Sequence, residues 1–534
     1  MAENKSQNYL HGAAILAVGV VIMKILGFVY KMPIGNIIGD DGYSMFLATY
    51  NIYNVFLSLA TAGLPIALSR LISEANAEGR PLQVRRTFTV ARRLFFWIGL
   101  VCTLIMLLLP EWMATSILHN PPTAMSIRAM APAVLLVCLV SAYRGYCQGC
   151  GNMIPTTVGQ VLEVLVKVLV GLALAYAAMR MGLGKAMGSA GAICGVTIGS
   201  LAALIYMWAY KRRNYRDDPN ANDVPDSDRR ILGRLLRIGV PIALGSSALA
   251  LLNLVDSSLC MGRLQSAAGY SLESAQTLYG VYGKAQTIFN LPAAIITPMT
   301  ISVVPAIAAA MVRGENDDAT HISEDSMRIA SVLSMPMGVG LAVLSYPIMK
   351  VIYPTSHVSG PALLAIMGVA SFFVCIVLME NAVLQAFGKE LLPMYTLITG
   401  GVVKIVINWF LVANPAINIY GAPIGTLVSY IVMAAMNFVF MCFVLDKNPR
   451  LSAICLKPLL CSLIMGACAW AVYGLASKFI GDAGRIRMLL CMVLAMGFAV
   501  VVYLIAAISS RAIMAKDMEL IPGGKKLARL LHMN

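Results

Sequence analysis

The chain has 534 residues, of which 59% are hydrophobic and only 12% are charged, and its formal net charge is +15. Soluble domains contain about 25% charged residues, so the composition excludes an ordinary soluble protein, and the mean hydropathy of +0.78 indicates a membrane protein. The positive charge does not indicate nucleic-acid binding, because most Lys and Arg lie in polar segments expected on the cytoplasmic side, as the positive-inside rule requires.

Apolar runs recur along the whole chain, and each is long enough to cross roughly 30 Å of hydrocarbon. We count about 14 of these runs, the first centred near residue 22. Their continuous apolar character predicts helices, because a β-barrel would need alternating polar and apolar residues. The sequence therefore predicts an all-α polytopic membrane protein with about 14 transmembrane helices and both termini in the cytoplasm.

The first run carries two lysines on one face. Lys24 lies near its middle, and Gly27 and Lys31 follow three and seven residues later. A charged side chain at the bilayer centre costs about 2.5–3.5 kcal/mol on insertion scales. We therefore expect Lys24 to line a water-filled cavity, whereas Lys31 either lines the same cavity or extends to the membrane interface.

Later runs carry further charged side chains. Glu163 and Lys167 are four residues apart on one helix face, so they either neutralise each other or line a cavity. Intramembrane ionisable residues usually face a bundle interior and mark a substrate or ion path. Several lysines suit an anionic substrate, because a low dielectric strengthens the attraction. The predicted substrate contacts are Lys24, Lys31, Glu163, Lys167, Lys284 and Lys404.

The most polar segment, residues 211–232, has the Asp, Asn, Pro and Arg content of a cytoplasmic linker. It separates a predicted six-helix lobe, residues 1–210, from a second six-helix lobe, residues 233–448. Residues 449–534 then supply two additional helices and a basic cytoplasmic tail.

The two lobes show signs of an internal duplication. "QGCG" at 148–151 precedes Lys167 by the same spacing at which "QAFG" at 385–388 precedes Lys404. The segments "GAICG" at 191–195 and "GAPIG" at 421–425 follow in the same order. A repeated unit of six spans keeps its orientation, so its symmetry axis runs along the membrane normal. We expect two pseudo-symmetric bundles around a central cavity, which is a transporter architecture.

Three observations argue against an enzyme or a metalloprotein. Cys147 and Cys150 form a C-x-x-C pair, but no second pair or nearby histidine completes a metal site. No G-x-x-x-x-G-K-[ST] segment is present, which argues against direct ATP use. The longest polar loop contains no histidine and has the composition of a linker. We therefore expect no metal and no cofactor other than a coupling ion, either Na⁺ or H⁺.

The N-terminal segment that starts "KILGFVYKMPIGNIIGDDGYSMFLATYNIYNVF" resembles the stage V sporulation protein B group of the multidrug/oligosaccharidyl-lipid/polysaccharide (MOP) flippase superfamily. The most specific part of the resemblance is "TAGLPIALSRLISE" at Thr61–Glu74, and "LEVLVKV" is a second match. The plan of 14 spans is similar to that of the MurJ-type lipid II flippases, and the resemblance covers essentially the whole chain.

The resemblance implies a flippase of the bacterial plasma membrane. Such a protein moves an undecaprenyl-diphosphate-linked saccharide, with lipid II as the first candidate, from the inner to the outer leaflet by alternating access. It would serve peptidoglycan or other envelope polysaccharide synthesis, with cell-wall synthesis proteins as possible partners. The alternative is a cation-coupled multidrug exporter of the same superfamily. The sequence leaves open whether the role is general or specific to sporulation.

The resemblance also assigns roles to individual residues. Lys24 falls at a cationic position of the first span, while the neighbouring cationic position is Tyr30 here, with Lys31 beside it. A sodium site in related flippases implies Asp256, Asn408 and Thr426 as oxygen ligands. Lys404, one turn before Asn408, departs from that pattern, because its ammonium group could occupy the place of the cation.

Overall fold

The computed structural model describes residues 19, 22–215, 222–445, 452–481, 484–510 and 512. Within these ranges, 13 helical segments are long and apolar enough to cross a membrane. The first predicted span begins before residue 22 and so lies partly outside the described residues; its described part is helical over residues 22–37. The helical, polytopic character predicted from the sequence is confirmed.

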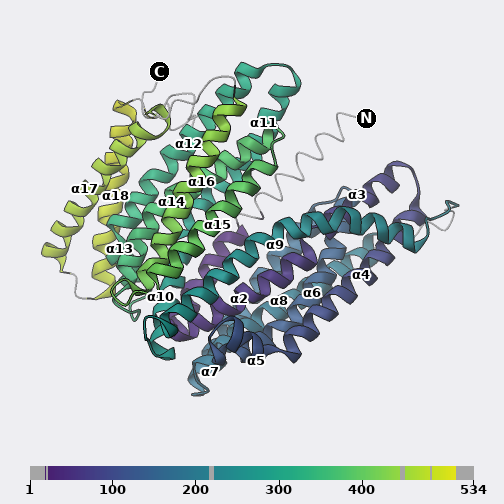
Figure 1. Ribbon diagram of the computed structural model, residues 1–534, viewed down its shortest axis with the longest axis horizontal. Helices are drawn as coiled ribbons and strands as arrows, with labels where there is room; N and C mark the ends of the chain where they lie inside the picture. Colours follow the sequence, from purple (N-terminus) through teal and green to yellow (C-terminus); the bar gives the residue numbers. More distant parts are fainter. Residues whose placement is uncertain are drawn as a thin grey trace. The chain divides into compact units, whose positions relative to one another are not determined.

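The helices of the first compact unit, residues 1–280, lie side by side in Figure 1. Their bounds are α2 (Gly39–Thr61), α3 (Leu64–Ala77), α4 (Pro81–Leu108), α6 (Ala124–Gly149), α7 (Ile154–Arg180), α8 (Lys185–Asn214) and α9 (Asp228–Ser266). The short segments α5 (Pro110–Trp112), η1 (Met113–Ile117) and η2 (Pro121–Thr123) join α4 to α6. Helix α9 packs against α2 and α3, so the first unit extends beyond the polar linker.

Glycines bring α7 and α8 into close contact. A Cβ atom on Gly195 would lie 2.5 Å from the Cα atom of Gly171, and one on Gly199 would lie 2.5 Å from the carbonyl oxygen of Glu163. Only a residue without a Cβ atom permits this approach, which is how small residues allow membrane helices to pack closely. The contact fixes the part of α7 that carries Glu163 and Lys167.

The second compact unit, residues 281–534, contains the remaining helices. Helix α10 (Leu272–Phe289) begins in the first unit and ends in the second, and its last residue is separated from α11 only by Asn290. The other elements of this unit are α11 (Leu291–Val312), α12 (Asn316–Val343), α13 (Ser345–Ile352), α14 (Gly360–Ala386), α15 (Leu391–Leu411), η3 (Asn418–Tyr420), α16 (Gly421–Val444), η4 (Ser452–Leu456), α17 (Lys457–Ile480) and α18 (Arg485–Ser509).

The two "Q-x-x-G" segments of the predicted repeat have the same backbone structure. Gly151 follows α6 with φ +79°, and Gly388 follows α14 with φ +72°. In both, the glycine N–H donates to the carbonyl of the glutamine at 2.9 Å, and the next N–H reaches a carbonyl five residues back. This is a Schellman cap, in which glycine tolerates the positive φ. The matching caps support the predicted duplication.

The described end of the linker is anchored to the first unit. Both carboxylate oxygens of Asp223 accept backbone N–H groups at the start of α4, from Leu82 and Gln83, at 2.8 Å. Arg86 of α4 pairs with Asp228 at the start of α9 at 2.5 Å. The contact-based boundary falls at Gly280, and the predicted lobe limits at 210, 232 and 448 stay predictions.

Candidate functional site

A partly buried ion pair crosses between α6 and α7 in the first unit. Nη2 of Arg144 lies 2.7 Å from Oε2 of Glu163, and the two side chains are 17% and 20% exposed. The hydroxyl of Ser200 on α8 donates to the other carboxylate oxygen at 3.3 Å. Glu163 thus forms its ion pair with Arg144 on the neighbouring helix and not with Lys167 one turn along its own helix. Arg144 was not among the residues predicted from the sequence.

Lys167 lies next to an aromatic ring from the first helix. Its Nζ atom is 5.6 Å from the centroid of the Tyr30 ring, within the range of a cation–π contact. The Tyr30 hydroxyl donates to the carbonyl of Ala192 at 2.7 Å, which fixes the ring. Lys31 is within electrostatic reach of Lys167. The structure therefore brings together Lys31 and Lys167, two of the predicted substrate lysines. They lie beside Tyr30, which stands where the family resemblance implies a cationic residue.

The cluster carries more positive than negative charge. Its cations are Lys31, Lys167 and Arg144, and its carboxylate is Glu163. Nε of Arg144 is buried and has no hydrogen-bond partner within the described part of the chain. The phenol groups of Tyr50 and Tyr53 are within electrostatic reach of Glu163 and line the α2 side. We call these seven residues, with Tyr30 included, the cationic cluster. Its excess of donors suits an anion such as a phosphate.

Lys24 lies on the same helix as Tyr30 and Lys31, and its side chain is exposed. The predicted cavity-facing role of this lysine stays a prediction. Arg144 escaped sequence reasoning because it lies close to the end of α6 that the sequence predicts to be cytoplasmic, where arginines are ordinary topological signals.

Lys284 in the second unit is completely buried on α10. Its Nζ atom lies 5.1 Å from the centroid of the Tyr353 ring, a second lysine–tyrosine contact. Lys404 is half-buried on α15, within electrostatic reach of Tyr430 on α16. Each of these two lysines therefore has a tyrosine near it, as Lys167 does in the first unit.

Two of the predicted ion ligands lie on adjacent helices. Asn408 on α15 is fully buried, and a Cβ atom on Gly425 of α16 would lie 2.1 Å from its Oδ1 atom. The Thr426 hydroxyl lies 3.5 Å from that of Tyr282. Asp256 is buried on α9 in the other unit. No group of three His, Cys, Asp or Glu residues suited to a metal occurs in the described ranges. The sodium site stays a prediction.

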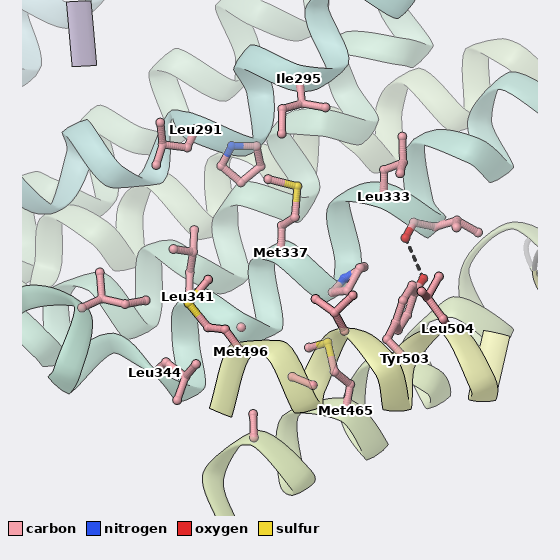
Figure 2. A pocket seen from close by; sticks show the side chains of 18 of the residues that line it. Leu291, Ile295, Leu333, Met337, Leu341, Leu344, Met465, Met496, Tyr503 and Leu504 are labelled. Atoms are coloured by element: carbon pink, nitrogen blue, oxygen red, sulfur yellow. Dashed lines mark hydrogen bonds between the residues drawn. The ribbon is translucent and has the colours of Figure 1, made fainter. Parts of the chain in front are cut away.

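An apolar pocket of about 600 Å³ lies within the second unit, between α11, α12, α17 and α18 (Figure 2). Leu291, Leu333, Met337, Met465 and Met496 are among the side chains that line it. The hydroxyl of Tyr503 donates to the carbonyl of Val332 at 2.6 Å, so the lining tyrosine has its polar atom occupied. The volume of the pocket is in the range of small-molecule sites, which run from about 300 to 1,000 Å³. Sequence reasoning gave no sign of this pocket.

Comparison with known proteins shows which protein family this chain resembles. A family model described as polysaccharide biosynthesis protein matches residues 9–311. Stage V sporulation protein B of Bacillus subtilis (strain 168) is 25% identical over 489 residues, covering 90% of this chain and 93% of the relative. Lipid II flippase MurJ of the same organism is 24% identical over 451 residues, covering 81% and 82%.

A solved structure has a similar fold. Lipid II flippase MurJ in an inward closed conformation matches with a TM-score of 0.69 and 14% identity, covering 93% of this chain and 99% of that chain. At this identity the likeness establishes the fold alone. The expected fold is confirmed, and so is the resemblance read from the N-terminal segment.

Proposed function

We propose that this chain, which belongs to the polysaccharide biosynthesis protein family, carries an anionic lipid-linked saccharide from the inner to the outer leaflet of a bacterial plasma membrane. The chain is a multi-pass membrane transporter of the MOP superfamily, related to lipid-linked oligosaccharide flippases, and not an enzyme. Lipid II is the first candidate substrate, because a relative that matches 81% of the chain is named as its flippase.

The observation that carries the proposal is the cationic cluster. Lys31, Lys167 and Arg144 place three positive charges beside one carboxylate within helices that span the membrane. Burying such an excess is costly unless an anion or water offsets it. A diphosphate supplies two negatively charged groups and several acceptor oxygens, and the unpartnered Nε of Arg144 offers it one donor.

The apolar pocket of the second unit suits a hydrocarbon chain. A lipid-linked saccharide has a long hydrocarbon chain, and transfer of each CH₂ group to an apolar environment contributes about 0.8 kcal/mol. A pocket lined by leucine and methionine side chains gives that chain an apolar contact surface. Methionine also adapts its shape to an irregular chain.

The Arg144–Glu163 pair gives the cluster a way to change during transport. In the present arrangement Glu163 holds the terminal nitrogen of Arg144 at 2.7 Å. An arriving phosphate competes for the same guanidinium, and Glu163 then retains only the hydrogen bond that it already accepts from Ser200 at 3.3 Å. Release of the phosphate restores the ion pair. The pair thereby returns the empty transporter to its starting state.

Complementation tests the proposal. The chain is expressed in a bacterium depleted of its lipid II flippase, beside an Lys167→Ala variant and a control, Lys389→Ala, which removes an exposed lysine just before α15. We expect rescue by the parent and the control, and failure by a well-inserted Lys167→Ala protein. No rescue by an inserted parent would exclude lipid II. A changed drug-susceptibility profile in its place would favour the multidrug exporter.

A further inference from the structure

Helices α2 and α9 of the first unit are joined by hydrogen bonds between polar side chains. The hydroxyl oxygens of Ser58 on α2 and Ser247 on α9 lie 3.2 Å apart. Seven residues earlier on α2, Asn51 donates to the Tyr279 hydroxyl at 3.4 Å, and that hydroxyl donates to Ser257 on α9 at 2.7 Å. The contacts follow in opposite order along the two helices, so α2 and α9 run antiparallel.

An asparagine lies between these two contacts on each helix. Asn54 lies three residues after one contact residue of α2 and four before the other, and Asn253 lies four residues from a contact residue of α9. The two amides are therefore at the same level of the helix pair, within about one turn. Thr61 and Ser246 each lie seven residues away, about 10 Å further in the same direction. We call these four residues the polar strip.

The four side chains of the polar strip lie on one side of the seam between α2 and α9. Successive residues are rotated by about 100° around a helix, which places each of the four about 50–80° from the contacting face, in the same rotational sense. Two antiparallel helices are related by a twofold axis across their seam. A similar rotation on both helices therefore brings the four residues to the same side.

The two sides of this seam differ in polarity. On the side opposite the polar strip, Leu59 of α2 is 42% exposed, and Leu244 and Leu251 of α9 are 62% and 47% exposed. On the strip side, the amides of Asn54 and Asn253 are exposed. An amide that faces hydrocarbon keeps its donors and acceptor unpaired, which is costly. The leucine side therefore suits lipid, whereas the polar strip suits water or a polar ligand.

The polar strip continues the cationic cluster along α2. Tyr50, a member of the cluster, is within electrostatic reach of Glu163. It precedes Asn54 by four residues, so the two side chains are neighbours on one face of the helix. A group bonded to a phosphate in the cluster is therefore close to the start of the strip.

We infer that the polar strip binds the saccharide of the lipid-linked substrate, by hydrogen bonds to its hydroxyl and acetamido groups. The inference rests on the proposed function, with lipid II as the substrate. Each asparagine amide offers two N–H donors and a carbonyl acceptor, and each hydroxyl can donate and accept. These uncharged groups match the neutral sugar rings, whereas the cationic cluster matches the phosphates. The strip is long enough for more than one ring.

The test compares two lipid diphosphates that differ only in the disaccharide. They are undecaprenyl diphosphate and lipid II from which an amidase has removed the peptide, and their dissociation constants are measured with the purified full-length protein in detergent. We expect the parent to bind the saccharide-bearing lipid about tenfold more tightly, because it adds several neutral hydrogen bonds. The double variant Asn54→Ala/Asn253→Ala should bind the two lipids about equally.

Two further variants show which part of the substrate each region reads. Lys167→Ala should weaken the binding of both lipids by a similar factor, because both carry the diphosphate. Asn214→Ala is the matched control, because it removes an exposed asparagine whose amide bonds only within α8. This control should keep the parent's preference for the saccharide.

The outcomes separate the inference from the proposed function. A parent that binds neither lipid would contradict the proposed function itself. A parent that binds both equally, or a double variant that keeps the preference, would overturn the inference and leave the proposed function standing. A double variant that loses affinity for both lipids by the same factor would show that the asparagines serve only the helix packing, which would also overturn it.

Discussion

The guanidinium group of Arg144 on α6 and the carboxylate of Glu163 on α7 form an ion pair of 2.7 Å within the membrane-spanning part of the first unit. Removing one partner of a fully buried ion pair typically costs about 3–5 kcal/mol, because the other charge is left uncompensated, and the partial exposure of this pair lowers that cost. The pair therefore links the stability of the helix packing to the charge of the proposed anion site.

Exchanging the two charges tests how far this pair acts alone. Arg144→Glu and Glu163→Arg should each strongly reduce the amount of folded protein, since each places like charges together. The double variant should recover folding but not transport, because Lys167 and Lys31 then face a relocated carboxylate. Membrane protein level and complementation measure the two effects separately. Full transport by the double variant would mean that the pair is only structural.

Exchanging Glu163 with Lys167 gives a different outcome. If the two residues served only each other, the exchange would be tolerated. Because Glu163 faces Arg144, a lysine at 163 would lie against the guanidinium, and we expect loss of both folding and transport. Retained transport in a complementation assay would contradict the role assigned to Arg144.

Lys24→Ala should leave expression and topology intact and strongly impair transport. The lysine is exposed on the first helix, so its removal opens no packing defect. Complementation beside a topology reporter measures both properties, and Lys24→Arg, which retains the charge, is the matched control. Normal transport by Lys24→Ala would remove this residue from the substrate path.

Filling the apolar pocket should block a hydrocarbon chain. Gly340 on α12 lines the pocket, and a Cβ atom built on it meets nothing within 4 Å. We expect Gly340→Phe to insert normally and to reduce complementation at least tenfold. The matched control is Gly497→Phe on α18, an exposed glycine that is equally unhindered. Equal activity of the two variants would argue against the pocket as a lipid-chain site.

The linker contact at Asp223 predicts a pH dependence outside the membrane. Burial acts to raise the pKa of Asp223, but the N–H groups of Leu82, Gln83 and Asp223 itself, with the nearby Arg80 guanidinium, lower the pKa below its usual value. A carboxyl whose pKa is lowered by folding stabilises the contact above its unfolded pKa of about 3.9, and the benefit is lost as the pH falls through the lower folded value.

Hydrogen exchange measures this contact directly. At neutral pH the Leu82 and Gln83 amides should be protected, and protection should fall in Asp223→Ala but largely persist in Asp223→Asn, which keeps one acceptor oxygen. Protection in the parent should persist down to about pH 4 and weaken only below that value. Protection unchanged in Asp223→Ala would show that the helix start is held without this side chain.

Much of the fold follows from local sequence. Apolar runs of sufficient length identify helices because lipid leaves no alternative for the backbone. The glycines at 151 and 388 predict their caps because few other residues adopt the required positive φ. The lysines at 24, 31 and 167 were recognisable one at a time, since a charge inside an apolar run is conspicuous.

Contacts between helices were not predictable in the same way. The partner of Glu163 depends on which face of α6 meets α7, and Arg144 gives no local sign of that contact. The apolar pocket lies between α12 and the C-terminal helices. An apolar helix face has the same sequence pattern whether it lines a pocket or faces lipid.

The matching caps at Gly151 and Gly388 allow the halves to be compared position by position. Arg144 lies seven residues before the first cap glycine, and Asn381 lies seven residues before the second. Glu163 lies twelve residues after the first, where the second half has Gly400, whose carbonyl accepts the hydroxyl of Ser429 at 2.7 Å. The first segment thus has an ion pair where the second has neutral groups, and Asn381 accepts the amide of Asn437 at 2.9 Å. The two segments therefore share a backbone turn, while only the first carries charged side chains at these positions.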